Sequence, residues 1–83
     1  MNKYYLKGDE DLNSQRLKGL IVGIDGNQIT LAKAMGLSLS RLNAKINETS
    51  GAEFTQSEIA FIKRRYGLSD SDTADIFFNP DLS

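Results

Sequence analysis

Apolar residues recur every three or four positions in five stretches of the chain, and short polar turns separate these stretches. This spacing is typical of amphipathic α-helices. Residues that can cap a helix N-terminus precede each stretch: Asn13, Asn27, Ser38, Thr55 and the segment 69–72. The pattern predicts helices over about 14–24, 28–35, 39–47, 56–66 and 70–78. We therefore predict an all-α fold, a compact five-helix bundle.

The chain is organised around the two helices predicted within residues 27–47. Leu31 and Met35 share one face of the first helix, and Leu42 and Ile46 share one face of the second. Gly36 stands between them, where the chain needs a residue that takes a positive φ at low cost. We expect a tight turn at this glycine. The outer face of the second helix carries no carboxylate and comprises Leu39, Ser40, Arg41, Asn43, Ala44 and Lys45.

Apolar stripes on the other helices complete the predicted core. The stripe of the first helix consists of Leu17, Leu20, Ile21 and Ile24. The residues expected to share one core are Leu17, Ile21, Leu31, Leu42, Ile46, Ile59 and Ile62. The last helix ends in Ile76, Phe77 and Phe78, and this apolar cluster is too large for one short helix to bury completely. At least one of the two rings is therefore expected to be free for a partner subunit.

Composition removes several classes of function. The 83 residues include no cysteine and no histidine, which excludes thiolate or imidazole catalysis and the usual zinc sites. The clustered carboxylates of Asp70, Asp72 and Asp75 are explained by their place in the last helix, where acidic groups favour the N-terminal end. We therefore expect no enzyme, no cofactor and no metal. The absence of a membrane-spanning run and of a signal peptide predicts a cytoplasmic protein without a membrane partner.

The charge is nearly balanced overall but unevenly distributed. The formal net charge is −1, whereas nucleic-acid-binding domains are usually basic. Residues 12–50 hold five basic and two acidic residues, and residues 51–83 hold three basic and six acidic ones. The positive part therefore coincides with the central helix pair. Modest affinity for a phosphate backbone, with a small dependence on salt, is expected for one copy of the chain.

The central helix pair resembles the helix-turn-helix of the lambdoid phage repressors and Cro proteins. The matching residues are Gln28, the pair Leu31–Ala32, Gly36 and Leu42. Lys45 departs from the pattern, because the family usually has an aliphatic residue there. The resemblance covers roughly residues 14–78 and implies a lambda repressor/Cro-like domain over 13–79. Residues 1–12 would then be a flexible N-terminal segment, and residues 80–83 a C-terminal tail.

The resemblance implies a transcriptional regulator that binds double-stranded operator DNA as a homodimer, with helix 39–46 in the major groove. Leu39, Ser40 and Ala44 would face base edges. Arg41 and Asn43 would reach a phosphate or a base, depending on a helix rotation that Lys45 leaves open. Gln28 and Asn47 would hold the sugar-phosphate backbone at two helix ends, and Asn27 would support that contact. The remaining residues of the implied DNA-binding face are Ser38, at the helix start, and Lys45.

Other interpretations of the same residues stay open. The helix pair could be an ordinary helical hairpin in a small bundle. Thr49 and Ser50 could contact a phosphate or lie in a plain solvated loop. The basic run 63–65 could contact a phosphate or complement a helix dipole. The nearly neutral charge and the apolar Leu39 and Ala44 favour an alternative function, an antirepressor-like module that binds another phage regulator rather than DNA.

Overall fold

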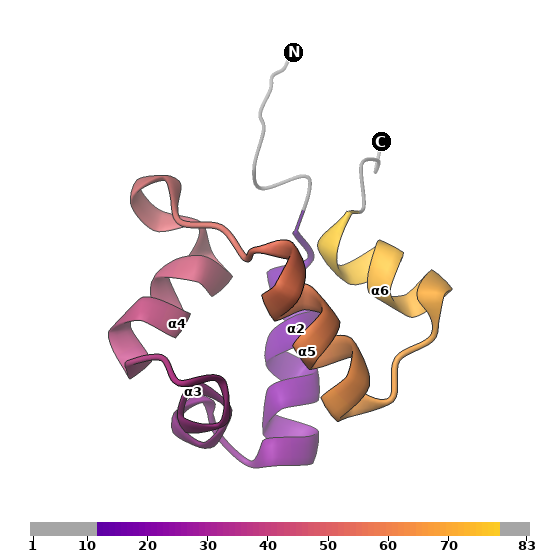
Figure 1. Cartoon of the computed structure of the whole chain (residues 1–83), viewed down its shortest axis with the longest axis horizontal. Coiled ribbons are helices and arrows are strands. Elements are labelled where there is room, and N and C mark those ends of the chain that lie inside the picture. The colour runs from indigo at the N-terminus through magenta and orange to yellow at the C-terminus, as the bar shows by residue number, and fades with distance from the viewer. Residues whose placement is uncertain (1–11, 79–83) are drawn as a thin grey trace.

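Five α-helices follow one another in the computed structural model, which describes residues 12–78 (Figure 1). No strand occurs in that range, so the predicted all-α class is confirmed for it. The helices are α2 (Ser14–Leu20), α3 (Gln28–Met35), α4 (Leu39–Asn47), α5 (Gln56–Tyr66) and α6 (Asp70–Phe77). A π-helical turn, η1 (Ile21–Asp25), continues α2, and a 3₁₀ turn, η2 (Thr49–Gly51), follows α4.

The predicted N-terminal caps all form. In each case a side-chain oxygen accepts a hydrogen bond from the backbone N–H three residues later, which satisfies one of the free donors of the first turn. Thr55 and Glu58 make a complete capping box, since the Glu58 carboxylate also accepts from the Thr55 backbone N–H at 2.9 Å. The capping residues are Asn13, Asn27, Ser38, Thr55 and Ser69.

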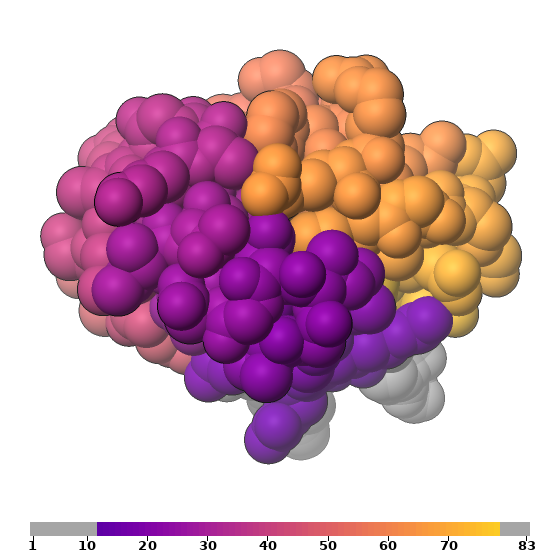
Figure 2. Space-filling model, turned by 90° about the horizontal axis from the view of Figure 1, so that it is seen from below, coloured from indigo at the N-terminus to yellow at the C-terminus, as the bar shows by residue number. Residues whose placement is uncertain are grey.

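One apolar core holds the helices together. The seven residues predicted for it all belong to a single buried cluster, and Leu12, Ala32, Tyr66, Ile76 and Phe77 join them. Helix α2 contacts α4 on one side and α6 on the other. In Figure 1, α3 and α4 accordingly lie to the left of α2, and α6 lies to its right. Figure 2 shows the same separation from below, with residues of α5 and α6 covering the right side of the surface.

The prediction that Ile24 faces the core is wrong. Its side chain is 53% exposed, and that of Val22 is 63% exposed. The cause is η1, in which the Gly26 N–H donates to the Ile21 carbonyl oxygen at 2.9 Å. A π-helical turn contains more residues than an α-helical turn, so positions beyond Ile21 leave the α-helical stripe. The turn therefore places the Ile24 side chain on the surface, where Val22 is also exposed.

The two ends of the described chain meet. The Asn13 N–H donates to the Ile76 carbonyl oxygen at 2.7 Å, which joins the start of α2 to α6. Leu12, the last residue of the predicted N-terminal segment, is 8% exposed and belongs to the core. Phe77 is buried and packs edge-to-face against Phe54, with 5.6 Å between ring centroids, whereas Phe78 is 47% exposed. The predictions for 1–11 and 79–83 lie outside the described residues.

Candidate nucleic-acid interface

A tight turn joins α3 to α4, and its geometry agrees with the prediction. Gly36 has φ 74° and ψ 26°, in the left-handed region that favours glycine. The Leu37 N–H donates to the Ala32 carbonyl oxygen at 2.9 Å, which closes the end of α3. Ala32 is 2% exposed and belongs to the core. Ser38 Oγ then accepts from the Arg41 N–H at 3.1 Å and begins α4.

The outer face of α4 presents small and polar side chains to solvent. Leu39 is 44% exposed and Ala44 is half-buried. Ser40, Arg41, Asn43 and Asn47 are exposed. The sequence-predicted site residues of α3 lie beside this face, with Asn27 exposed and Gln28 half-buried. The turn therefore brings together the predicted surface residues Asn27, Gln28, Ser38, Leu39, Ser40, Arg41, Asn43, Ala44 and Asn47.

The prediction that Lys45 lies on the outer face of α4 is wrong. Its side chain is 8% exposed and turns inward. The ammonium group Nζ donates to Glu58 Oε1 at 2.9 Å and to the Glu53 carbonyl oxygen at 3.0 Å. The apolar stem of a lysine can occupy a core position when its charge finds such partners. Lys45 thus fills the position of an aliphatic residue without rotating α4, because Leu42 and Ile46 both remain fully buried.

A chain of side-chain amides connects α3 to the outer face of α4. Asn43 Nδ2 donates to Gln28 Oε1 at 3.0 Å, and Asn47 Nδ2 donates to Asn43 Oδ1 at 3.0 Å. These bonds orient Asn43, whose role the sequence left open. They also leave part of each amide's hydrogen-bonding capacity for other groups, because an amide has two donor hydrogens and two acceptor sites. The three amides form a pre-arranged polar strip.

Two grooves flank α4. The first is mainly apolar, and its lining includes Val22, Ile29, Leu39, Ala44 and Thr49. Ile29 is 49% exposed, so three large aliphatic side chains meet solvent here. The second groove is more polar and runs between α4 and the following loop, where Arg41 faces the segment 50–53. Thr49 and Ser50, the two candidate loop residues, therefore line different grooves.

Most acidic groups near the helices are neutralised by ion pairs. Asp25, at the end of η1, lies in a bidentate contact with Arg65, whose Nη2 donates to Asp25 Oδ1 at 2.7 Å. The Tyr66 hydroxyl donates to the second oxygen of the same carboxylate. The Arg65 bonds outweigh burial and hold the pKa of Asp25 below its ordinary value. Burial and the Asp25 carboxylate raise the pKa of Tyr66.

The other ion pairs decide which cations remain available. Arg16 bonds to Asp72, with Asp75 at 3.7 Å, and Lys63 bonds to Asp70 at 2.7 Å. The hydrogen bonds from Arg16 and from Lys63 hold the pKa values of Asp72 and Asp70, respectively, below the ordinary range. Lys63 and Arg65, two members of the basic run 63–65, therefore form ion pairs within the chain. Between residues 12 and 78, the cations without a carboxylate within ion-pair distance are Lys18, Lys33, Arg41 and Arg64.

Sequence reasoning missed Val22 and Ile29 as surface residues of this region. Val22 lies outside the predicted stripe, and nothing in the apolar pattern indicated that it would line one groove together with Ile29. Within the described chain, no helix is long and apolar enough to cross a membrane. The same part of the chain has no cluster of three His, Cys, Asp or Glu residues that could hold a metal ion.

No protein-family model, no curated protein and no solved structure matches this chain. The function therefore has to be inferred from the geometry of the α3–α4 surface itself.

Proposed function

We propose that the protein is a sequence-specific DNA-binding transcriptional regulator of the phage repressor/Cro type, in which α3 and α4 act as a helix-turn-helix. One observation supports this proposal most strongly. The exposed face of α4 carries Leu39, Ser40, Arg41 and Asn43, and Arg41 has no carboxylate partner among the described residues. A polar helix face with an unpaired cation and no acidic group suits a major groove bordered by phosphates.

The chemistry of this face assigns different roles to its residues. Leu39 and Ala44 would pack on thymine methyl groups, and Ser40 would donate to or accept from a base edge. Arg41 lies on the side of the polar groove, next to Ser38 and the N-terminal end of α4. Free N–H groups at that helix end favour an anion, so Arg41 and the first turn of α4 would hold one phosphate.

The amide strip would act on the other side of α4. Gln28 begins α3, and its side-chain carbonyl accepts from Asn43. In a complex, Gln28 and Asn27 would contact the backbone of the DNA while the bond to Asn43 holds that amide toward a base edge. Asn47 extends the strip toward the end of α4. Lys45 contributes no DNA contact in this proposal, because its charge is used by Glu58 and the Glu53 carbonyl.

Two copies of the domain would be needed for useful specificity. Few side chains on one α4 face can make a strong bidentate base contact, and a two-fold site doubles the contacts. Phe78 is 47% exposed and borders a shallow groove between α5 and α6 together with Ala60 and Ala74. This apolar surface is the proposed contact between the two copies.

The proposal is tested by selecting binding sequences from a random duplex library and measuring affinity by fluorescence anisotropy. Arg41→Ala should weaken binding, whereas the matched variant Arg64→Ala, which removes an exposed charge from α5, should leave binding nearly unchanged. Equal affinity of the parent and both variants for every duplex would contradict a DNA-binding role for α4. Enrichment of no sequence, with binding that disappears at moderate salt, would restrict the function to non-specific contact.

The apolar groove supports a second candidate function, an antirepressor-like module that binds another regulator. Val22, Ile29 and Leu39 together expose aliphatic surface that a DNA backbone does not require. In this case Val22→Ser and Ile29→Ser should abolish a protein complex that forms without DNA, and Arg41→Ala should have little effect. The DNA-binding proposal predicts the reverse order of effects for binding to duplex DNA.

A further inference from the structure

The apolar groove beside α4 gathers most of the large apolar side chains that the described chain exposes. Three of the five line it: Val22, Ile29 and Leu39. They come from η1, α3 and α4, so three elements meet at one surface. Single exposed apolar residues are ordinary on a protein, whereas a contiguous group of them indicates a binding surface. The groove is therefore a candidate docking site, and the charges around it indicate what docks there.

The unpaired charges at the border of the groove are positive. Lys33 follows Ile29 by four positions on α3, and this spacing places the two side chains on one face of the helix. Lys18 stands one helical turn before Val22 in the same way. Neither lysine has a carboxylate within ion-pair distance among the described residues. None of the described residues that line the groove is acidic, and the neighbouring Asp25 carboxylate is 5% exposed and already paired with α5. The groove thus combines an apolar floor with unpaired cations.

The backbone around the groove decides the form of a peptide that could occupy it. Helices and turns line the groove, and no strand occurs between residues 12 and 78. An extended peptide therefore finds no strand edge with which to pair its own N–H and C=O groups. A helix satisfies these groups internally and presents apolar anchors along one face. An amphipathic helix is the segment that suits this surface.

We infer that the apolar groove binds an acidic amphipathic helix of another protein. The apolar face of that helix packs on Val22, Ile29 and Leu39, and its carboxylates lie next to Lys18 and Lys33. The inference names the chemistry of the partner in the second candidate function. The binding itself does not rest on the proposed DNA binding.

A second copy of the chain does not supply this helix from its described part. Helix α6 carries three carboxylates, but each lies within ion-pair distance of Arg16 or Lys63 of its own chain. Its large apolar residues Ile76 and Phe77 are buried in its own core. The acidic helix therefore belongs to a different protein.

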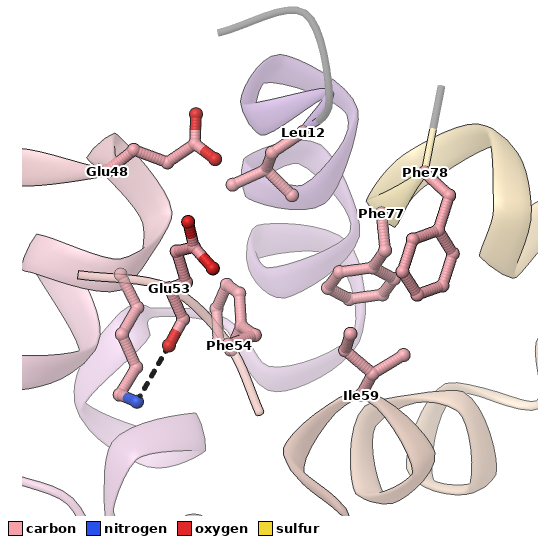
Figure 3. Close-up of a pocket in the computed structure, with 8 residues that line it drawn as sticks. Leu12, Glu48, Glu53, Phe54, Ile59, Phe77 and Phe78 are labelled. Atoms are coloured by element: carbon pink, nitrogen blue, oxygen red, sulfur yellow. Dashed lines mark hydrogen bonds between the residues drawn. The ribbon is translucent and has the colours of Figure 1, made fainter. Parts of the chain in front are cut away.

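Another apolar hollow of the chain differs from the groove in its charges. It lies between the start of α2, the loop before α5 and the end of α6, and Phe54, Ile59 and Phe77 point toward one another across it (Figure 3). Lys45 is the one cation among its described lining residues. The Lys45 ammonium group donates to the Glu53 carbonyl oxygen, the contact drawn as a dashed line in Figure 3. An acidic helix is therefore expected at the groove and not at this hollow.

A titration of the isotope-labelled full chain, followed by nuclear magnetic resonance, tests the inference. The probe is a designed helical peptide with a leucine stripe on one face and glutamates beside it. We expect the methyl resonances of Val22, Ile29 and Leu39 to shift, with little change at Ile59 in the hollow. A peptide of the same composition in scrambled order should bind roughly tenfold more weakly, and so should a peptide with lysine in place of glutamate.

Charge reversal tests the cations separately. Lys33→Glu should weaken binding of the acidic peptide roughly two- to tenfold and strengthen binding of the lysine peptide. Arg64→Glu serves as the matched control, because Arg64 is also exposed and without a carboxylate partner in the described chain but does not line the groove. It should change neither affinity. Ile29→Ser removes an exposed anchor and should weaken the acidic peptide without unfolding the chain.

The inference is overturned if the acidic peptide shifts no groove resonance at about 1 mM, or if either control peptide binds as tightly. Shifts of Val22 and Ile29 with duplex DNA but not with the peptide would also overturn it, because they would assign the groove to a phosphate backbone. Only the effect on DNA rests on the proposed function. Ser40 and Asn43 line the same groove, so the peptide should displace a selected duplex. A protein that binds the peptide but no duplex supports the inference and contradicts the DNA-binding proposal.

Discussion

Lys45 Nζ lies 2.9 Å from Glu58 Oε1, and this contact joins α4 to α5 at the edge of the core. Glu58 has a second role, since the same oxygen accepts from the Thr55 N–H and completes the capping box of α5. Burial would raise the pKa of Glu58, but the bonds from Thr55 and Lys45 outweigh it and hold the pKa below the ordinary value. One carboxylate thus begins a helix and neutralises a buried lysine.

The two members of this pair are predicted to differ in their effect on stability. Glu58→Gln preserves an oxygen for the capping box but leaves the Lys45 charge, which is 8% exposed, with only neutral carbonyl partners. Lys45→Met keeps the apolar stem and leaves a carboxylate that is 20% exposed and can be solvated. We expect Glu58→Gln to cost about 1–3 kcal/mol and Lys45→Met to cost less. Urea denaturation would measure both, and a larger loss for Lys45→Met would contradict this account.

Local rules explain why much of the fold could be predicted. A capping side chain acts on a backbone N–H three residues away, so Asn27 and Ser38 mark helix starts without knowledge of the tertiary structure. The i, i+3, i+4 stripe similarly identified the buried Leu42 and Ile46. Where these rules hold, the sequence predicted both the helix bounds and the core.

Contacts between distant residues could not be predicted in the same way. Ile24 lies outside the core because of a π-helical turn. A search for apolar residues that repeat every 3.6 positions does not detect such a turn. Lys45 was assigned to the surface because its partner, Glu58, is thirteen residues away and was already explained as a cap. The Asn43–Gln28 bond likewise depends on the angle between α3 and α4. The outer face of α4 was therefore predicted more accurately than the orientation of its polar groups.

Gly36 and Gly19 should respond oppositely to the same substitution. A Cβ at either position would meet no atom within 4 Å, so packing does not distinguish them. Gly36 has φ 74°, and a side chain in this region costs about 1–2 kcal/mol. Gly19 lies inside α2, where alanine is favoured over glycine by about 1 kcal/mol. Thermal denaturation should show a lower midpoint for Gly36→Ala and a higher one for Gly19→Ala. A stable Gly36→Val variant would contradict the turn.

Asp25 should make folding stability depend on acid pH. Its folded pKa lies below the ordinary 3.8, so its contribution is complete above about pH 5 and is lost as the pH falls through 3.8 toward the folded pKa. Asp25→Asn should therefore destabilise the protein by about 1–3 kcal/mol at pH 7 and by less at pH 3. Asp75→Asn serves as a control, because Asp75 is exposed and lies 3.7 Å from Arg16. An Asp25→Asn difference that is equal at both pH values would contradict this assignment.

Phe78 is predicted to control self-association. Its ring is 47% exposed at the border of the α5–α6 groove, whereas the neighbouring Phe77 is in the core. Phe78→Ser should shift a dimer toward the monomer with little loss of stability, while Phe77→Ser should destabilise the fold itself. Sedimentation equilibrium over a range of concentrations would measure the change. A parent protein that remains monomeric at high concentration would exclude this surface as a dimer contact.

Arg41 and Leu39 are predicted to separate affinity from specificity in DNA binding. If Arg41 holds a phosphate, Arg41→Ala should weaken binding to all duplexes alike and reduce the slope of log affinity against log salt by about one. If Arg41 reads a base, the loss should be about 1–3 kcal/mol and confined to the selected sequence. Leu39→Ala removes only apolar contact, so it should relax sequence preference at one position without changing the salt slope. Anisotropy with the selected and a random duplex at several salt concentrations distinguishes these outcomes. An unchanged preference in Leu39→Ala would place Leu39 outside the groove and favour the apolar surface as a protein-binding site.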